Sequence, residues 1–343
     1  MPTISVLMTV FNAERFIKES IESILFQSFS DFEFIILNDG STDNSLNIIQ
    51  SFSDVRIRII NDGKLGYYFA KQRLIEEAKC EYIAIMDADD IAHPTRFEKQ
   101  LLFLQNNPTY SLVSARANYI DVNNKDLKKS IDFFESNDEI KCNLLFTNVI
   151  VHPCVMIRKS ILDENKLNYL PIAGEDFDLW IRIAQRSKVY NLNNFLLSYR
   201  IHPNNMTHSK WYTLKDGIQT LITNEIKYYF FEEVDDIDIK LHLSLIDFSL
   251  KNKLSDLPLL QFWIQKLITL NQKHQHFDEQ ILKQVLYERV LKKYLRLTEY
   301  NFSVFQNLIK IKKILQPTLT FELRKKEMAI LVFSIARKKI VQL

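Results

Sequence analysis

Three carboxylates, those of Asp87, Asp89 and Asp90, directly follow the apolar run 82–86. Carboxylates this close together repel one another and resist leaving water, so at the end of a buried strand they require a cation or a solvated turn. A divalent metal ion that holds a substrate diphosphate meets this requirement best. The structural alternative is an acidic turn in which Asp89 or Asp90 caps the next helix, as is common where a strand leads into a helix.

A second polar cluster, residues 38–43, lies between an apolar run and a helical pattern. At the end of a strand the Asp39 carboxylate can accept two hydrogen bonds from the edge of a pyrimidine or a ribose, and Gly40 permits the turn. The side chains after Gly40 are typical helix caps, and we assign them that role. We predict that Asp39 binds a ligand, because the acidic turn is expected nearby.

Three further acids, Glu175, Asp176 and Asp178, crowd the first turn of a predicted helix directly after Gly174. The N-terminus of a helix favours negative charge, so these acids have a sound structural role. One acid would serve that role, and we therefore predict that one of the three is a general base. The helix dipole lowers the pKa of such a group and the neighbouring acids raise it. The sequence leaves open which effect is larger.

Two histidines precede prolines. His202 follows a predicted strand and could reach a metal or a phosphate at the same crevice, but an exposed structural role is an equally good interpretation. His152 lies inside an apolar segment, so we assign it to the core.

The elements that position these residues follow from the apolar pattern. Strands are predicted at 4–10, 34–37, 55–60 and 82–86, with helical periods between them and after Pro94. Such βα units predict an α/β fold with a Rossmann-like, mainly parallel sheet and helices on both faces. Ligands of these sheets bind beyond the carboxyl ends of the strands, so the polar clusters are expected to converge on one crevice.

The rest of the chain has a different pattern. Short strands are predicted at 112–113, 149–157 and 196–199, and a helix is predicted from Glu175. From about residue 211 onward, leucine, isoleucine and aromatic residues recur at helical spacing.

The length of 343 residues is enough for two domains. We predict an α/β domain over 1–210, with halves at about 1–110 and 111–210, and a C-terminal all-helical region over 211–343. The three cysteines form no CxxC pair, so we expect neither a disulfide nor a structural zinc. The N-terminus lacks a basic segment followed by an apolar one, so we expect a cytoplasmic protein.

Charge is unevenly distributed. Residues 281–343 contain 14 Lys and Arg against 4 Asp and Glu, which leaves 30 against 38 in the first 280 residues. Two basic triplets, 324–326 and 337–339, flank nine largely apolar residues, too few for the ~20 that span a bilayer. Two interpretations stay open: this tail lies on an anionic membrane surface, or it packs its apolar face on the domain. The acidic body argues against nucleic acid as a partner.

Taken in order, these motifs resemble those of the inverting family-2 glycosyltransferases, which have the GT-A fold and in many cases build bacterial surface polysaccharides. The resemblance covers about residues 3–205. It rests on five motifs: Thr9-Val10-Phe11-Asn12, the cluster 38–43, the DXD-like Asp87-Ala88-Asp89-Asp90, the Glu175-Asp176 pair before Leu179-Trp180, and Tyr199-Arg200-Ile201-His202.

The resemblance implies a hexosyl- or N-acetylhexosaminyltransferase. The donor is expected to be a nucleotide sugar, in particular a UDP-sugar, and the acceptor a saccharide or a lipid-linked saccharide. The implied site roles are these: Asp39 binds uracil, Thr9 and Phe11 line the nucleotide pocket, Asp87 meets the ribose, Asp89 holds Mg²⁺ or Mn²⁺, His202 is a further metal ligand, Asp176 is the base and Glu175 contacts the acceptor.

The chain departs from the family pattern at several places, among them Leu74 and Cys80, where the family has glycine. Val10 and Phe11 replace a usual proline and tyrosine, and Ala70-Lys71-Gln72 replaces Ala-Arg-Asn. Lys71 can still neutralise a donor phosphate, but as a point charge without the bidentate fork of arginine.

Two other functions fit parts of the pattern. Paired carboxylates are also typical of glycosidases, which need neither a metal nor a diphosphate. A non-catalytic scaffold or saccharide-binding subunit of a polysaccharide assembly complex would use the helical region as its working surface.

Overall fold

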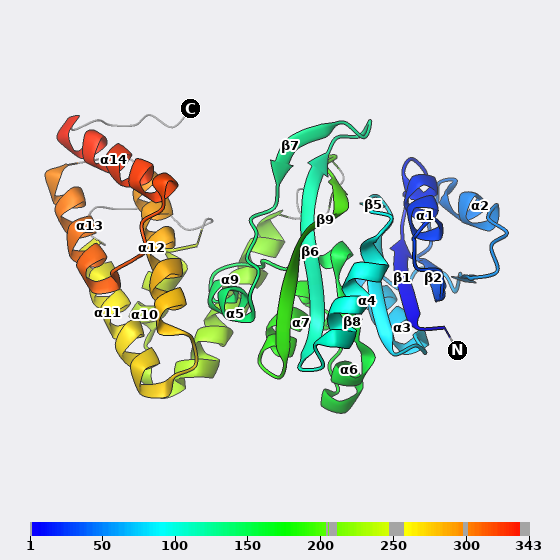
Figure 1. Cartoon of the computed structure of the whole chain (residues 1–343), viewed down its shortest axis with the longest axis horizontal. Helices are drawn as coiled ribbons and strands as arrows, with labels where there is room; N and C mark the ends of the chain where they lie inside the picture. Colours follow the sequence, from blue (N-terminus) through cyan, green and yellow to red (C-terminus); the bar gives the residue numbers. More distant parts are fainter. Residues whose placement is uncertain (1, 204, 206–210, 247–256, 298–300, 337–343) are drawn as a thin grey trace. The chain divides into compact units, whose positions relative to one another are not determined.

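The computed structural model describes residues 2–203, 205, 211–246, 257–297 and 301–336 (Figure 1). The chain divides into two compact units. The first, which we call the α/β unit, comprises Met1–Ile140 and Asn148–Gly217. The second, the helical unit, comprises Lys141–Thr147 and Ile218–Leu343.

The first half of the sheet consists of parallel strands in the order β3-β2-β1-β4. Helices connect these strands, so the predicted βα units are confirmed. The elements are β1 (Ile4–Val10), α1 (Ile17–Leu25), β2 (Phe32–Asn38), α2 (Ser45–Gln50), β3 (Ile57–Ile60), α3 (Tyr67–Glu77) and β4 (Tyr82–Asp87).

The second half of the sheet is mixed, whereas the sequence predicted mainly parallel strands. Strand β8 runs antiparallel to both β4 and β6, and β6 and β9 run parallel to each other. Two short strands that the sequence did not predict, β5 and β7, pair antiparallel with β9 and β6. The elements are β5 (Ile91–Ala92), α4 (Arg96–Asn106), β6 (Tyr110–Ile120), β7 (Asp126–Ser130), β8 (Met156–Arg158) and β9 (Lys188–Arg200).

The prediction of a strand at 149–157 is wrong for most of that segment. Only β8 is extended and paired, and the 3₁₀ helix η1 (His152–Cys154) precedes it. Pro153 has no backbone N–H to donate to a neighbouring strand, which favours a turn at this point over a continued ladder. The apolar character of the segment reflects burial and not strand structure.

Helices pack on both faces of the sheet, as predicted. Alternate residues of β1, such as Val6 and Met8, join a core with α1, α2 and α4. The residues between them, Leu7 and Thr9, face α3 on the opposite side. This alternation is the period-2 pattern of a strand that is buried on both faces.

The remaining elements complete both units. The α/β unit contains α6 (Lys159–Asn165) and α7 (Glu175–Ala184), while α5 (Asn137–Leu144) and α9 (Trp211–Phe230) belong partly to each unit. The predicted all-helical C-terminal region is confirmed for those of its residues that the structure describes. Its further elements are η2 (Phe231–Glu233), α10 (Asp236–Leu243), α11 (Leu257–His274), α12 (Glu279–Leu295), α13 (Phe302–Leu315) and α14 (Phe321–Ala336).

The helical unit has its own core, in which large side chains such as Trp263, Tyr287 and Tyr294 are fully buried. Among the described residues, no helix combines the length and the apolar character needed to cross a membrane. The second basic triplet of the sequence, 337–339, lies outside the described residues.

Candidate active site

The sheet register brings the predicted donor residues to one edge. Thr9 pairs with Leu37 on one side and with Asp87 on the other. Val10 pairs with Asn38, so Asp39 follows at the same edge, and its N–H donates to the Val10 carbonyl at 2.8 Å. Three segments that are distant in sequence therefore end side by side, beyond the carboxyl ends of β1, β2 and β4.

The acidic turn after β4 is compact. One carboxylate oxygen from each of Asp87, Asp89 and Asp90 lies within 4.8 Å of the others. The Asp87 and Asp89 side chains are 33% and 26% exposed, whereas Asp90 is 1% exposed. Burial, together with the charges of Asp89 and Asp87, raises the pKa of Asp90 well above its usual range.

Asp90 also has an oxygen without a partner. Its Oδ1 accepts the Arg200 N–H at 2.8 Å, but its Oδ2 is buried and makes no hydrogen bond among the described residues. A buried carboxylate oxygen without a partner is costly. The turn thus offers oxygen ligands and an unmet demand for positive charge, which suits a hard divalent cation.

The end of β9 holds this acidic turn. The buried Arg200 donates from Nε to the Asp89 carbonyl at 2.7 Å, and its Nη2 lies 2.9 Å from Glu19 Oε2. The His202 Nε2 lies 2.8 Å from Asp89 Oδ2. The Phe16 ring lies against both, with the guanidinium carbon 4.6 Å and the imidazole centroid 5.1 Å from its centre. His202 is therefore placed at the acidic turn, and Arg200 is a support that the sequence did not identify.

Asp39 is buried and organises the loop before α3. Its Oδ1 accepts the backbone N–H groups of Leu65 at 2.6 Å and Gly66 at 2.9 Å. Phe11, just after β1, is 49% exposed, and the Lys64 ammonium lies 4.8 Å from the centre of its ring. Phe11 thus offers a flat aromatic surface at the rim of the sheet edge.

The first turn of α7 contains a buried ion pair. Gly174 precedes the helix with φ 80°, a left-handed conformation that glycine adopts without strain. The Glu175 Oε1 lies 2.7 Å from Lys71 Nζ, and the two side chains are 7% and 5% exposed. Lys71 also donates to the Tyr67 hydroxyl. In this structure Lys71 therefore binds Glu175 of α7.

Neighbouring Asp176 has a different environment. Its Oδ2 accepts a hydrogen bond from Asn148 Nδ2 at 3.0 Å. Burial and the charge of Glu175 raise the pKa of Asp176. Burial also opposes ionisation of Glu175, but Lys71 outweighs it, so the pKa of Glu175 is lowered. The same two adjacent acids thus have pKa values displaced in opposite directions, an arrangement typical of acid–base sites.

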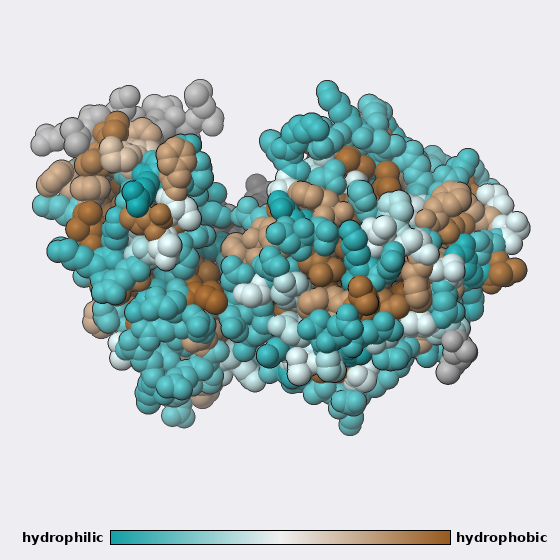
Figure 2. Space-filling model, viewed as in Figure 1, coloured by the Kyte–Doolittle hydropathy of each residue, from teal (hydrophilic) through white to brown (hydrophobic). Residues whose placement is uncertain are grey.

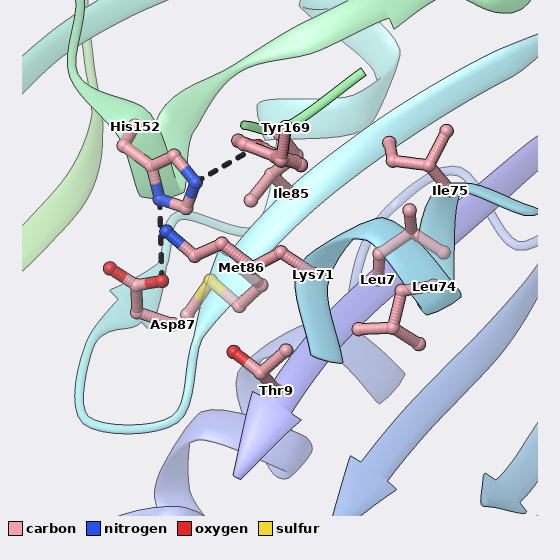
Figure 3. Close-up of a pocket in the computed structure, with 10 residues that line it drawn as sticks. All are labelled: Leu7, Thr9, Lys71, Leu74, Ile75, Ile85, Met86, Asp87, His152 and Tyr169. Atoms are coloured by element: carbon pink, nitrogen blue, oxygen red, sulfur yellow. Dashed lines mark hydrogen bonds and ion pairs between the residues drawn. The ribbon is translucent and has the colours of Figure 1, made fainter. Parts of the chain in front are cut away.

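A small pocket lies between the sheet edge and α3 (Figure 3). Thr9, Lys71, Asp87, His152 and Tyr169 supply its polar groups. His152 is buried, as the sequence predicted, but its ring faces this pocket and contacts Asp87 at 3.4 Å and Tyr169 at 3.1 Å. Sequence reasoning missed this role, although the His-Pro pair at 152–153 repeats the one at 202–203.

The site combines groups that could bind a metal ion with a group that could accept a proton. Oxygen ligands for a divalent cation lie at the ends of the strands, and Asp176, a carboxylate with a raised pKa, lies on α7, which is joined to α3 by the pair of Glu175 and Lys71. A Rossmann-like sheet with an acidic turn after its fourth strand and a carboxylate pair on a later helix is the arrangement that the resemblance to GT-A glycosyltransferases predicted.

Comparison with known proteins supports this classification. Residues 5–165 match the family model Glycosyl transferase family 2. An uncharacterized glycosyltransferase of Methanocaldococcus jannaschii is 36% identical and aligns over 58% of this chain and 71% of its own length. The UDP-Glc:alpha-D-GlcNAc-diphosphoundecaprenol beta-1,3-glucosyltransferase WfgD of Escherichia coli is 28% identical over 70% of this chain and 94% of its own. The chain belongs to glycosyltransferase family 2.

A solved structure shows the same fold over most of the chain. Residues 1–349 of S. aureus TarS, in complex with UDP-GlcNAc, superpose with a TM-score of 0.56 at 16% sequence identity. The superposition covers 92% of this chain and 90% of that one. Together with the family match, this shared fold shows that the protein is a glycosyltransferase of GT-A fold with a helical C-terminal region.

Proposed function

We propose that the protein transfers a hexosyl or N-acetylhexosaminyl group from a UDP-sugar to a saccharide or lipid-linked saccharide, with inversion at the anomeric carbon and with a divalent metal. One observation supports this most: Asp87 at the sheet edge and Glu175 of α7 both contact a single group of side chains, Asp87 through His152 and Glu175 through Lys71, and Tyr169 lies beside both.

The donor half of the proposal rests on the sheet edge. Asp39 and Asp87 are acceptors for the uracil and ribose edges, Thr9 lies between them on β1, and the exposed Phe11 ring can stack on the base. The name of WfgD specifies UDP-Glc as its donor, and TarS was solved with UDP-GlcNAc. Both support a uridine diphosphate sugar for this chain.

The acidic turn fits Mg²⁺ or Mn²⁺. Asp89 would hold the ion with help from its neighbour His202, and the Asp87 carboxylate, whose pKa is lowered by His152, would add negative charge beside it. When bound, such an ion stabilises the negative charge that develops on the departing diphosphate.

Asp176 is the proposed base. It takes the proton of the acceptor hydroxyl while that oxygen forms a bond to the anomeric carbon. The bond from the anomeric carbon to the diphosphate oxygen breaks, and UDP leaves with the bonding electrons. A raised pKa makes Asp176 a better proton acceptor than an ordinary aspartate, and Glu175 beside it provides part of that shift. One displacement of an α-linked donor gives a β-glycoside.

For the acceptor we propose a lipid-linked saccharide of surface polysaccharide synthesis. The name of WfgD specifies a diphosphoundecaprenol-linked acceptor and a β-1,3 product, which supports both the acceptor class and the inversion. Such an acceptor is membrane-bound, so the enzyme needs access to a membrane surface.

Helix α14 offers a surface of that kind. Leu323 and Ile330 pack in the core of the helical unit, while Phe321, Met328 and Val332 on another face are 72%, 56% and 55% exposed. The exposed, basic Arg324 and Lys325 fall between them at helical spacing. Hydrophobic side chains gather over α13 and α14 in Figure 2. We propose that this face of α14 makes a peripheral contact with anionic lipid.

The experiment that tests the function is a panel of nucleotide sugars assayed for metal-dependent transfer to saccharide and lipid-linked acceptors. We expect transfer from a UDP-sugar that EDTA abolishes. The variant Asp176→Asn should retain donor binding and lose transfer by about 10²–10⁴-fold, the usual contribution of a general base. Near-normal transfer by purified Asp176→Asn would exclude this base, and hydrolysis without a nucleotide sugar would indicate a glycosidase.

A further inference from the structure

We propose that His152 is a positioning residue for the donor, which orients the Asp87 carboxylate through its Nδ1 and is itself fixed by Tyr169 through its Nε2. The inference rests on the proposed donor-binding role of Asp87, and it gives a function to a buried histidine that the reaction itself does not use.

The placement of His152 is unusual for a core residue. Its ring is 9% exposed and lies about 6 Å from the rings of Trp180 and Tyr169. The 3₁₀ helix η1 interrupts the approach to β8, and the turn presents the imidazole to the end of β4 (Figure 3). Irregular backbone beside a strand often re-aims a side chain towards a site.

The two ring nitrogens have distinct partners. Nδ1 lies 3.4 Å from Asp87 Oδ1, and Nε2 lies 3.1 Å from the Tyr169 hydroxyl. An ionised carboxylate can only accept, so Nδ1 must carry the hydrogen. The Tyr169 hydroxyl can then donate to Nε2, and this second bond selects the tautomer that serves Asp87.

Asp87 needs such a partner. It terminates β4 and is 33% exposed, so packing covers only part of its side chain. Among the described residues, His152 provides the one polar side-chain contact within 3.5 Å of the Asp87 carboxylate. An oriented acceptor binds a ribose hydroxyl better than a mobile one, because less rotational freedom is lost on binding.

Tyr169, which fixes His152, is itself held by helix α3. The Tyr169 N–H donates to Gln72 Oε1 at 3.1 Å, and Gln72 is next to Lys71 on α3. Asp87 and Glu175 are therefore both fixed against the same helix, one through His152 and Tyr169 and the other through Lys71. Helix α3 therefore helps to orient both the donor-binding Asp87 and the acid Glu175.

Two substitutions at His152 distinguish the roles of its two ring nitrogens. The amide nitrogen of Asn occupies the position of Nδ1, and that of Gln occupies the position of Nε2. We expect His152→Asn to bind UDP with nearly unchanged affinity. We expect His152→Gln to bind UDP and the UDP-sugar about 10-fold more weakly, with a raised KM and a smaller change in kcat. Tyr169→Phe should fall between the two.

A matched control is His242→Gln. His242 is also buried, and its Nε2 hydrogen-bonds the Leu145 carbonyl within the helical unit. This variant should leave the KM for the donor unchanged. Circular dichroism and thermal unfolding of each variant establish that the protein compared is folded.

A double-mutant cycle gives the decisive result. If His152 acts through Asp87, His152→Gln adds no further loss of UDP affinity in an Asp87→Asn background. Equal losses in His152→Asn and His152→Gln, or additive losses in the cycle, would overturn the positioning role while leaving the glycosyltransferase function in place. Failure of the wild-type protein to bind UDP at all would instead overturn the proposed donor and this inference with it.

Discussion

The Nζ of Lys71 lies 2.7 Å from the Oε1 of Glu175, and both side chains are almost completely shielded from water. Burial alone would lower the pKa of Lys71, but Glu175 and the other surrounding anions raise it above its ordinary value. Both members of the pair are therefore charged at neutral pH. The pair joins α3 to α7 across 104 residues of sequence.

Removal of Lys71 should be strongly destabilising. Lys71→Met leaves Glu175 buried without a cation, and we expect the free energy of unfolding in urea to fall by about 3–5 kcal/mol. The double variant Lys71→Met/Glu175→Gln should recover part of that loss. The control is Lys159→Met, which breaks the more exposed pair with Asp163 and should cost less than about 1 kcal/mol. Equal losses in the two single variants would contradict a desolvated pair.

The pH profile of transfer should depend on Glu175. Asp176 must be ionised to accept a proton, so kcat falls as the pH drops through its pKa, which is raised by burial and by Glu175. Glu175→Gln removes the neighbouring negative charge, lowers the pKa of Asp176 and moves the acid limb of the profile to lower pH. Glu164→Gln, an exposed change on α6, should leave the limb in place. An unmoved limb in Glu175→Gln would show that another group titrates.

Gly217 supports the turn that precedes the acid pair. An added Cβ at Gly217 in α9 would lie 2.5 Å from the Ala173 carbonyl oxygen and 2.6 Å from its Cβ. Gly217→Ala should favour the helix by about 1 kcal/mol on propensity alone. We expect the clash to outweigh this gain, to destabilise the protein by about 1–3 kcal/mol and to lower kcat by displacing Asp176.

The control for Gly217 is Lys215→Ala, a change on the same turn of α9 without added bulk. It should leave kcat and the unfolding midpoint nearly unchanged. A Gly217→Ala variant that is more stable than wild type and fully active would refute the close packing of α9 against Ala173.

Membrane contact through α14 should need both charge and apolar surface. The full-length variant Met328→Glu/Val332→Glu should lose sedimentation with vesicles that contain phosphatidylglycerol, and wild type should bind phosphatidylcholine vesicles far more weakly. Phe262 on α11 is 68% exposed, so Phe262→Glu is a matched control that should bind as wild type does. Unchanged binding by the α14 variant would remove this face as the contact.

Much of the sheet edge was predictable because it depends on local patterns. A buried parallel strand is a short apolar run, and the polar residue that follows it lies at the carboxyl edge. This reasoning placed Asp39 and Asp87 at strand ends on one edge of the sheet, and the pairing of Thr9 with Asp87 and of Val10 with Asn38 has that geometry. The helical region was equally predictable, because its apolar and aromatic residues recur at helical spacing.

The contacts that tune the site were not predictable in the same way. Lys71 and Glu175 are far apart in sequence, and no period links them, so Lys71 was assigned to a donor phosphate. His152 was correctly predicted to be buried, but an apolar run does not reveal that a 3₁₀ turn aims the ring at Asp87. Residues 141–147 likewise join the helical unit through buried side chains, Cys142, Leu145 and Phe146, that no local signal distinguishes from the α/β core.

The central claim is that the acidic turn holds a uridine diphosphate through a divalent cation, and titration calorimetry tests it directly. We predict that the wild-type protein binds UDP with Mn²⁺ present and loses that binding in EDTA, and that Asp89→Ala shows no Mn²⁺-dependent binding while Asp176→Asn binds as wild type does. UDP binding that is identical with Mn²⁺ and with EDTA, or that is unchanged in Asp89→Ala, would contradict the account.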